Sequence, residues 1–135
     1  MSDSRVYVRS NPLCLEHDPG LGHPDSARRV EVILDALTSG TSGRWVVDRR
    51  APLPPEADTI GVLKWIHEAD YIERVRAAAE EGHGWLDTQD CRVSRRTFDA
   101  ALAAAGLALN AALDLVNGRL DRAFVVLRPP SHHAE

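Results

Sequence analysis

The sequence predicts an α/β fold built on a parallel sheet, and two adjoining segments carry most of that prediction. Residues 95–118 hold apolar side chains at helical spacing over about six turns. They are followed by RAFVVLR at residues 122–128, where apolar residues do not alternate with polar ones. Such a run is typical of a strand that is buried on both faces. A long helix followed by such a strand is half of a βαβ unit, which places the strand in a parallel sheet flanked by helices.

Two strands and one helix are expected in the N-terminal part of the chain. RVYVR (residues 5–9) and WVVD (residues 45–48) are rich in β-branched and aromatic residues, as strands are. Residues 11–26 contain turn-forming residues throughout and are expected to be a long loop. A helix is expected over residues 25–37, where four apolar residues recur with the spacing of a half-buried face: Val30, Ile33, Leu34 and Leu37.

Two further helices are expected after the second strand. The first follows a proline pair and covers residues 56–67, because proline is favoured at a helix start. The second covers residues 68–82, with Gly82 as its end. Its apolar face is formed by Ile72, Val75 and Ala79. Residues 82–93 show no steady period and are expected to be a loop.

The long helix that precedes the last strand is expected to begin at Ser94, acting as its N-cap, and to end at Gly118. Its many alanines would allow another element to approach closely. The larger apolar residues that keep helical spacing along it are Phe98, Leu102, Leu109, Leu113 and Val116, together with Ala105 and Ala112.

Composition and length are those of a small globular domain or of a piece of a larger one. The chain has 135 residues, of which 44% are hydrophobic, and a formal net charge of −4. This hydrophobic content argues against disorder. The mild charge and the lack of a Lys-rich block give no reason to expect a nucleic-acid partner.

Cysteine usage and the N-terminal sequence point to a cytoplasmic protein. Cys14 and Cys91 lie far apart and are expected to be free thiols in a reducing compartment. The N-terminus has no apolar core of signal-peptide length. No stretch is expected to reach the ~20 apolar residues that span a bilayer, so no membrane partner is expected.

Two adjacent histidines, His132 and His133, follow the last strand. Ligands of open α/β sheets bind at the carboxyl ends of the strands, which gives this pair a functional interpretation. Imidazoles at such a place can transfer protons near neutral pH. A solvated tail without a function is the alternative that these residues alone leave open. The six histidines show no spacing typical of a complete zinc site.

Four stretches, in order, resemble the zinc-dependent histone deacetylase family, which includes acetylpolyamine amidohydrolases and acetoin-utilisation proteins. The most specific is RPPSHHAE at residues 128–135, similar to the family motif R-P-P-G-H-H-A. The others are HDPGLGHPDSARRVEVILDAL at 17–37, WIHEADYIERV at 65–75 and DTQDCRVSRRTFDAALAAAG at 87–106. The resemblance implies an arginase/deacetylase-like fold, an open and mostly parallel sheet flanked by helices. Residues 1–135 are then expected to be the N-terminal portion of a single, truncated deacetylase domain.

The resemblance also implies a reaction and site residues. The family hydrolyses acetyl-amides, such as an acetylated peptide or an acetylpolyamine, with zinc polarising the carbonyl and activating water. His133 matches the general base and acid, and His132 matches the histidine that holds charge beside the attacking water. Asp90 matches the rim aspartate that accepts substrate N–H groups, with Asp87 as a competitor. Arg29 matches an arginine of the channel through which acetate leaves.

Several alternatives stay open beside these assignments. The family's zinc ligands, a D-x-H pair and a further aspartate, are expected after Glu135, so no metal ligand is assigned here and the chain alone is expected to be inactive. A non-catalytic remnant or an acetyl-amide binding module of the same fold is the competing function. Arg29 can also be read as a surface charge and Asp90 as a loop cap. His23 and His67 are expected to be structural, with backbone hydrogen bonds.

The chain departs from the family motifs at two positions. Ala27 stands where a proline is common, and Ser131 stands where a glycine is common.

Overall fold

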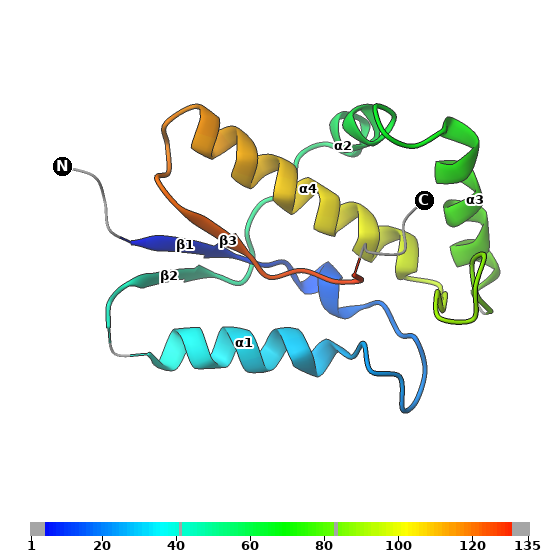
Figure 1. Ribbon diagram of the computed structural model, residues 1–135, viewed down its shortest axis with the longest axis horizontal. Helices are drawn as coiled ribbons and strands as arrows, with labels where there is room; N and C mark the ends of the chain where they lie inside the picture. The colour runs from blue at the N-terminus through cyan, green and yellow to red at the C-terminus, as the bar shows by residue number, and fades with distance from the viewer. Residues whose placement is uncertain (1–4, 41, 83, 131–135) are drawn as a thin grey trace.

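A computed structural model of the chain describes residues 5–40, 42–82 and 84–130. Three short strands form one parallel sheet in the order β2-β1-β3: β1 (Val6–Arg9), β2 (Trp45–Asp48) and β3 (Ala123–Val125). In the central strand, Val6 lies opposite Trp45 of β2, and Tyr7 lies opposite Ala123 of β3. Helices cover both faces of this sheet (Figure 1). The predicted α/β class with a parallel sheet is confirmed, as are the two predicted N-terminal strands.

The helices occur where periodicity predicts them, with shifted ends. They are the 3₁₀ turn η1 (Pro12–Leu15), α1 (Ala27–Ser39), α2 (Glu56–Leu63), α3 (Ala69–Glu81) and α4 (Thr97–Val116). The turn η1 lies inside the stretch predicted to be a loop. Helix α2 ends four residues earlier than predicted. Gly82 ends α3 as predicted, in the left-handed conformation with φ +82° that glycine adopts without strain.

Ser94 is not the N-cap of α4, so this prediction is wrong. Arg96 occupies that position and makes no side-chain capping bond. Ser94 instead belongs to the turn before the helix, where its N–H donates to Thr97 Oγ1 at 2.7 Å and its carbonyl accepts from the Thr97 N–H at 3.0 Å. The N-cap therefore lies two residues later than predicted, and the Thr97 hydroxyl bonds to Ser94 and contacts His17.

One core lies between the sheet and α1. Val8 of β1 and Val126, just after β3, point to this face and are buried with Val30 and Leu34 of α1. Ile33, predicted to share the buried face of the helix, is 40% exposed. It lies toward the β3 edge of the sheet, where it lines a shallow hollow with Phe124.

A second core lies between the sheet and α4. Its buried members are small, apart from one leucine: Cys14, Ala51, Ala103, Ala104 and Leu107. The face that α4 buries is therefore formed largely by alanines, which permit close packing. Of the larger residues predicted to form a stripe, Leu113 and Val116 are 46% and 85% exposed. Both cysteines are free, as expected.

Strand β3 is not buried on both faces within the described residues. Phe124 in its middle is 44% exposed. The order β2-β1-β3 makes β3 an edge strand within the described residues, and an edge strand lacks a neighbour to cover its outer side. The flanking Val126 is buried against α1.

Helix α4 is long and apolar enough, by length and composition, to cross a membrane. The expectation that no stretch qualifies is therefore wrong on these measures. In the fold, α4 packs on η1, α2, α3 and β3. Its Asn110 side chain donates to the backbone oxygen of Pro52 at 2.9 Å, and its Asp114 pairs with Arg9 of β1. These contacts are those of a core helix of the α/β unit.

Helix α4 lies tightly against the chain preceding α2 at Gly106. A Cβ atom at this position would lie 2.9 Å from Cδ of Pro54, whose ring cannot turn away, and 3.2 Å from Thr59 Oγ1. We expect Gly106→Ala to destabilise the protein by about 1 kcal/mol, because overpacking exceeds the gain in helix propensity. Gly61→Ala in α2 is the matched control, since that Cβ meets open space. The urea midpoints of unfolding of the two variants should shift in opposite directions from that of the wild type. Equal shifts would contradict this packing.

Candidate functional site

The candidate site lies at the carboxyl edge of the sheet, where parallel α/β sheets bind their ligands. Residues 10–26 leave this edge after β1, and residues 126–130 leave it after β3. The start of α4 lies beside them, because the Asp18 N–H donates to Ser94 Oγ at 3.1 Å. His132 and His133 follow in the sequence but lie outside the described residues, so their assigned functions stay predictions.

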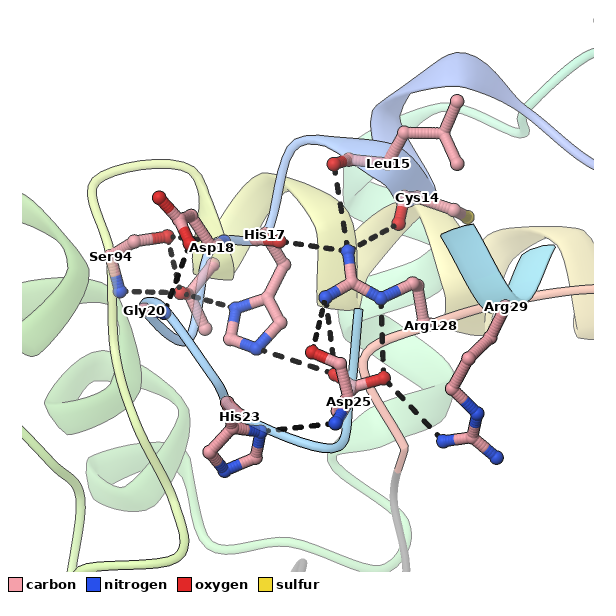
Figure 2. A network of polar contacts seen from close by, with 11 residues as sticks. Cys14, Leu15, His17, Asp18, Gly20, His23, Asp25, Arg29, Ser94 and Arg128 are labelled. Carbon is pink, nitrogen blue, oxygen red and sulfur yellow. Dashed lines mark hydrogen bonds and ion pairs between the residues drawn. The ribbon is translucent and has the colours of Figure 1, made fainter. Parts of the chain in front are cut away.

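Arg128 is the central polar side chain of this edge, and it is almost fully buried (Figure 2). Its Nε and Nη2 atoms donate to the two carboxylate oxygens of Asp25, each at 3.2 Å. Nη2 also donates to the Asp25 carbonyl at 3.3 Å. Nη1 donates to the carbonyls of His17 at 2.7 Å, Cys14 at 3.3 Å and Leu15 at 3.5 Å. The guanidinium thus ties the end of β3 to the segment that follows β1.

His17 is buried beside this pair and links it to α4. Its Nδ1 lies 2.8 Å from Thr97 Oγ1, and its Nε2 lies 3.6 Å from Asp25 Oδ2. Thr97 Oγ1 also accepts the N–H of Ser94 at 2.7 Å and lies 3.1 Å from Ser94 Oγ. The carboxylate beside Nε2 favours the tautomer that carries its proton on that nitrogen.

The pKa of His17 is lowered from 6.5, chiefly by burial and then by the positive charge of Arg128, against the opposing effect of Asp25. His23 lowers it further and Asp18 raises it. Burial disfavours the charged imidazolium, so the native state holds His17 neutral.

This neutral histidine should make stability fall in mild acid. A lowered native pKa means that the unfolded chain binds the proton more readily. The contribution of His17 is therefore complete above its unfolded pKa of 6.5 and is lost as the pH falls below that value. We expect the free energy of unfolding, measured in urea, to decrease between about pH 7.5 and pH 5.5. In His17→Asn this decrease should be smaller. The control His67→Asn should keep the wild-type dependence, and an equally steep decline in His17→Asn would refute the assignment.

Arg29 lies next to this network but faces solvent. Its side chain is 64% exposed, and its Nη1 atom lies 3.7 Å from Asp25 Oδ1. With Asp25 and Arg128 it lines the hollow of about 180 Å³ at the β3 edge. The structure thus places Arg29 at the candidate site, and its assignment to an acetate channel stays a prediction.

The two candidate rim aspartates differ in their surroundings. Asp87 has φ +56° and forms an ion pair with Arg74 of α3. Asp90 is exposed in the same loop, and no described residue holds its carboxylate in a hydrogen bond or ion pair. A carboxylate without an internal partner can accept hydrogen bonds from a ligand, which favours Asp90 over Asp87.

His23 and His67, the two histidines predicted to be structural, lie near the same edge. His23 Nδ1 accepts the backbone N–H of Asp25 at 3.1 Å, as expected for a structural residue. The ring of His67 stacks on Tyr71, with ring centroids 5.4 Å apart. The rings of His67 and Tyr71 line an apolar hollow of about 350 Å³ between α3, α4 and the segment after β3. Pro129 and Pro130 also line this hollow. The strand end therefore borders an apolar depression on one side and the buried polar network on the other.

The described residues do not fit a zinc site. Among residues 5–40, 42–82 and 84–130, no three His, Cys, Asp or Glu side chains lie close enough together to hold a metal ion. The donor set that zinc requires is therefore not present in this part of the chain.

Sequence reasoning missed His17, Asp25 and Arg128 as members of one cluster. One signal could have singled out Arg128: it is a charged residue directly after an apolar run predicted to be buried. A buried charge needs a partner, but its partner lies 103 positions earlier in the chain. No local pattern connects the two.

Comparison with known proteins identifies the family. The histone deacetylase domain model matches residues 23–135. A histone deacetylase-like amidohydrolase of Pseudomonas aeruginosa is 38% identical over 82% of this chain and 27% of its own length. A probable deacetylase of Archaeoglobus fulgidus is 30% identical over 90% of this chain and 33% of its own length. The chain thus spans about a third of the length of these relatives.

The fold agrees with this assignment. The crystal structure of the HDA15 HD domain superimposes with a TM-score of 0.79 over 98% of this chain and 37% of that domain, at 24% sequence identity. The three-stranded parallel sheet and its helices therefore have the same fold as part of that domain. Since the family model covers most of the sequence, the chain belongs to the histone deacetylase domain family.

Proposed function

We propose that this chain is part of a zinc-dependent deacetylase that hydrolyses acetyl-amides, with acetyl-lysine peptides or acetylpolyamines as the substrate class. The observation that carries the proposal is the position of the R-P-P-S-H-H motif. Its arginine and prolines leave the carboxyl edge of the parallel sheet, and the histidine pair follows directly in the sequence. The names of the relatives, a probable deacetylase and a histone deacetylase-like amidohydrolase, support the same reaction class.

In the proposed reaction His133 moves the proton. It takes a proton from the attacking water, whose oxygen bonds to the acetyl carbon, and returns it to the nitrogen as the amide C–N bond breaks. Acetate and a free amine are the products. His132 would hold charge beside the water, Asp90 would accept substrate N–H groups, and Arg29 would line the exit of acetate.

Zinc and the remaining domain belong to the proposal as well. The metal would be bound by residues outside the described part of this chain, because that part lacks a suitable donor group. Residues 1–135 would be the N-terminal portion of one deacetylase domain, in a cytoplasmic protein.

The test is hydrolysis by the protein that contains the complete domain. We expect release of acetate from a fluorogenic acetyl-lysine peptide or from an acetylpolyamine. A chelator should abolish the release, and added zinc should restore it. Binding of the acetyl-amides without any hydrolysis would overturn the proposal in favour of a binding module. Hydrolysis that a chelator leaves intact would remove zinc from it.

The two rim aspartates provide a prediction about substrate binding. We expect Asp90→Asn to lower kcat/KM for an acetylated peptide by about tenfold, because a charged hydrogen bond to the substrate is lost. Asp87→Asn is the matched control and should change kcat/KM by less than about threefold, since exposed ion pairs contribute little. Asparagine also tolerates the positive φ at position 87, so the loop is preserved. The reverse ordering would show that Asp87 is the rim aspartate.

A further inference from the structure

Arg128 connects two segments that are more than 100 positions apart. Its side chain is 3% exposed, and all three of its nitrogen atoms donate to acceptors in residues 14–25. A guanidinium offers its donors in a fixed planar fork, so these contacts also fix the direction of the acceptors. Arg128 therefore ties residues 14–25 to the end of β3 by hydrogen bonds, beside the packing of Cys14 and Leu15 in the two cores.

Asp25 connects Arg128 to Arg29 and His17. Its Oδ1 is shared by Arg128 Nε at 3.2 Å and Arg29 Nη1 at 3.7 Å. Its Oδ2 is shared by Arg128 Nη2 at 3.2 Å and His17 Nε2 at 3.6 Å. Figure 2 shows the Asp25 carboxylate between these three side chains. A shift of Arg128 would move the carboxylate, and with it the start of α1, where Arg29 lies.

The loop that follows η1 has few other anchors. Residues 18, 20–22, 24 and 26 are exposed, and Leu21 is fully exposed. The loop's own hydrogen bonds, from Gly20 N–H to the Asp18 carboxylate and from His23 N–H to the Gly20 carbonyl, shape it locally without attaching it to the sheet. Its polar attachments to the rest of the described chain are Arg128, Thr97 of α4, and Ser94 and Arg96 just before that helix; Pro19 in the loop is buried.

We propose that Arg128 is a positioning residue of the site, which locks residues 17–25 onto the end of β3 and so sets the relative places of Arg29 and of the strand end that leads to the histidine pair. This inference rests on the proposed deacetylase function. Lysine cannot replace the arginine, because one ammonium cannot span both Asp25 oxygens and the His17 carbonyl.

The first test is Arg128→Lys in the protein that contains the complete domain. We expect kcat to fall by about tenfold or more while KM changes by less than about threefold, because misplacing catalytic groups costs rate rather than binding. The control is Arg49→Lys, whose arginine forms a comparable 2.7 Å pair with Asp35 on the surface. It should leave both constants unchanged. Wild-type kcat in Arg128→Lys would overturn the inference.

The second test needs no activity and uses the same protein with the complete domain. Arg128→Lys should shift the backbone amide NMR signals of residues 17–25 and of Arg29, and should leave those of β2 in place. Arg49→Lys should not shift the signals of residues 17–25. Unmoved signals at residues 17–25 in Arg128→Lys would overturn the inference even if activity is lost.

Two further outcomes keep the proposals separate. If the wild-type domain hydrolyses no acetyl-amide, the proposed function fails, and the NMR comparison still decides whether Arg128 holds the loop. If Arg128→Lys does not fold, Asp25→Asn provides the same comparison, because it keeps the side-chain shape and removes the charge. Wild-type amide signals in Asp25→Asn would then count against the inference.

Discussion

Replacement of His133 by alanine should lower kcat about 10²–10⁴-fold in the protein that contains the complete domain, the usual contribution of a general acid–base residue. This loss corresponds to about 3–5 kcal/mol of transition-state stabilisation. The expected effect is large because one imidazole both removes the proton from water and returns it to the leaving nitrogen. KM should change little, since neither transfer occurs in the ground state.

The measurement is a steady-state assay with the fluorogenic acetyl-lysine substrate, combined with zinc analysis and thermal unfolding of the same samples. Zinc content and the unfolding midpoint should equal those of the wild type, because the proposed function gives His133 no bond to the metal. Turnover close to the wild-type rate would remove His133 from proton transfer. A parallel loss of zinc would instead make it a metal ligand.

The elements of the fold could be predicted because each has a strong local pattern. Val30 and Leu34 follow the helical period of α1, and the β-rich runs at residues 5–9 and 45–48 form β1 and β2. What a local pattern does not encode is the place of an element in the sheet and the competing use of a capping side chain. The exposure of Phe124 follows from the edge position of β3, which its own sequence does not encode. The late start of α4 accompanies a turn in which Ser94 bonds to Thr97, whose hydroxyl also contacts His17, 80 positions away.

The candidate site could be predicted only as far as its motifs reach. The histidine pair, Asp90 and Arg29 lie in stretches that resemble a family, so sequence alone singles them out. The buried network has no such local signature. Its hydrogen bonds join residues 14–25 to Arg128, and it forms only when β1 and β3 pair in parallel and bring their carboxyl ends together.

Removal of the Asp25 carboxylate should have the largest effect on stability. In Asp25→Ala the guanidinium of Arg128 would stay buried with backbone carbonyls as its only acceptors. Removing one partner of a buried ion pair typically costs about 3–5 kcal/mol. Since a domain has about 5–15 kcal/mol of stability in total, this variant should lose a large fraction of its stability.

Asp35→Ala is the matched control, because it removes the partner of an exposed arginine. Asp35 is 72% exposed and lies 2.7 Å from Arg49, so its loss should cost at most about 1 kcal/mol. Urea unfolding of the two variants measures the difference, and equal costs would contradict a buried charge pair. Adding Arg128→Met to Asp25→Ala tests the cause. If the uncompensated charge is responsible, the double variant should be less destabilised than the sum of the two single variants, since the methionine leaves no charge to be buried.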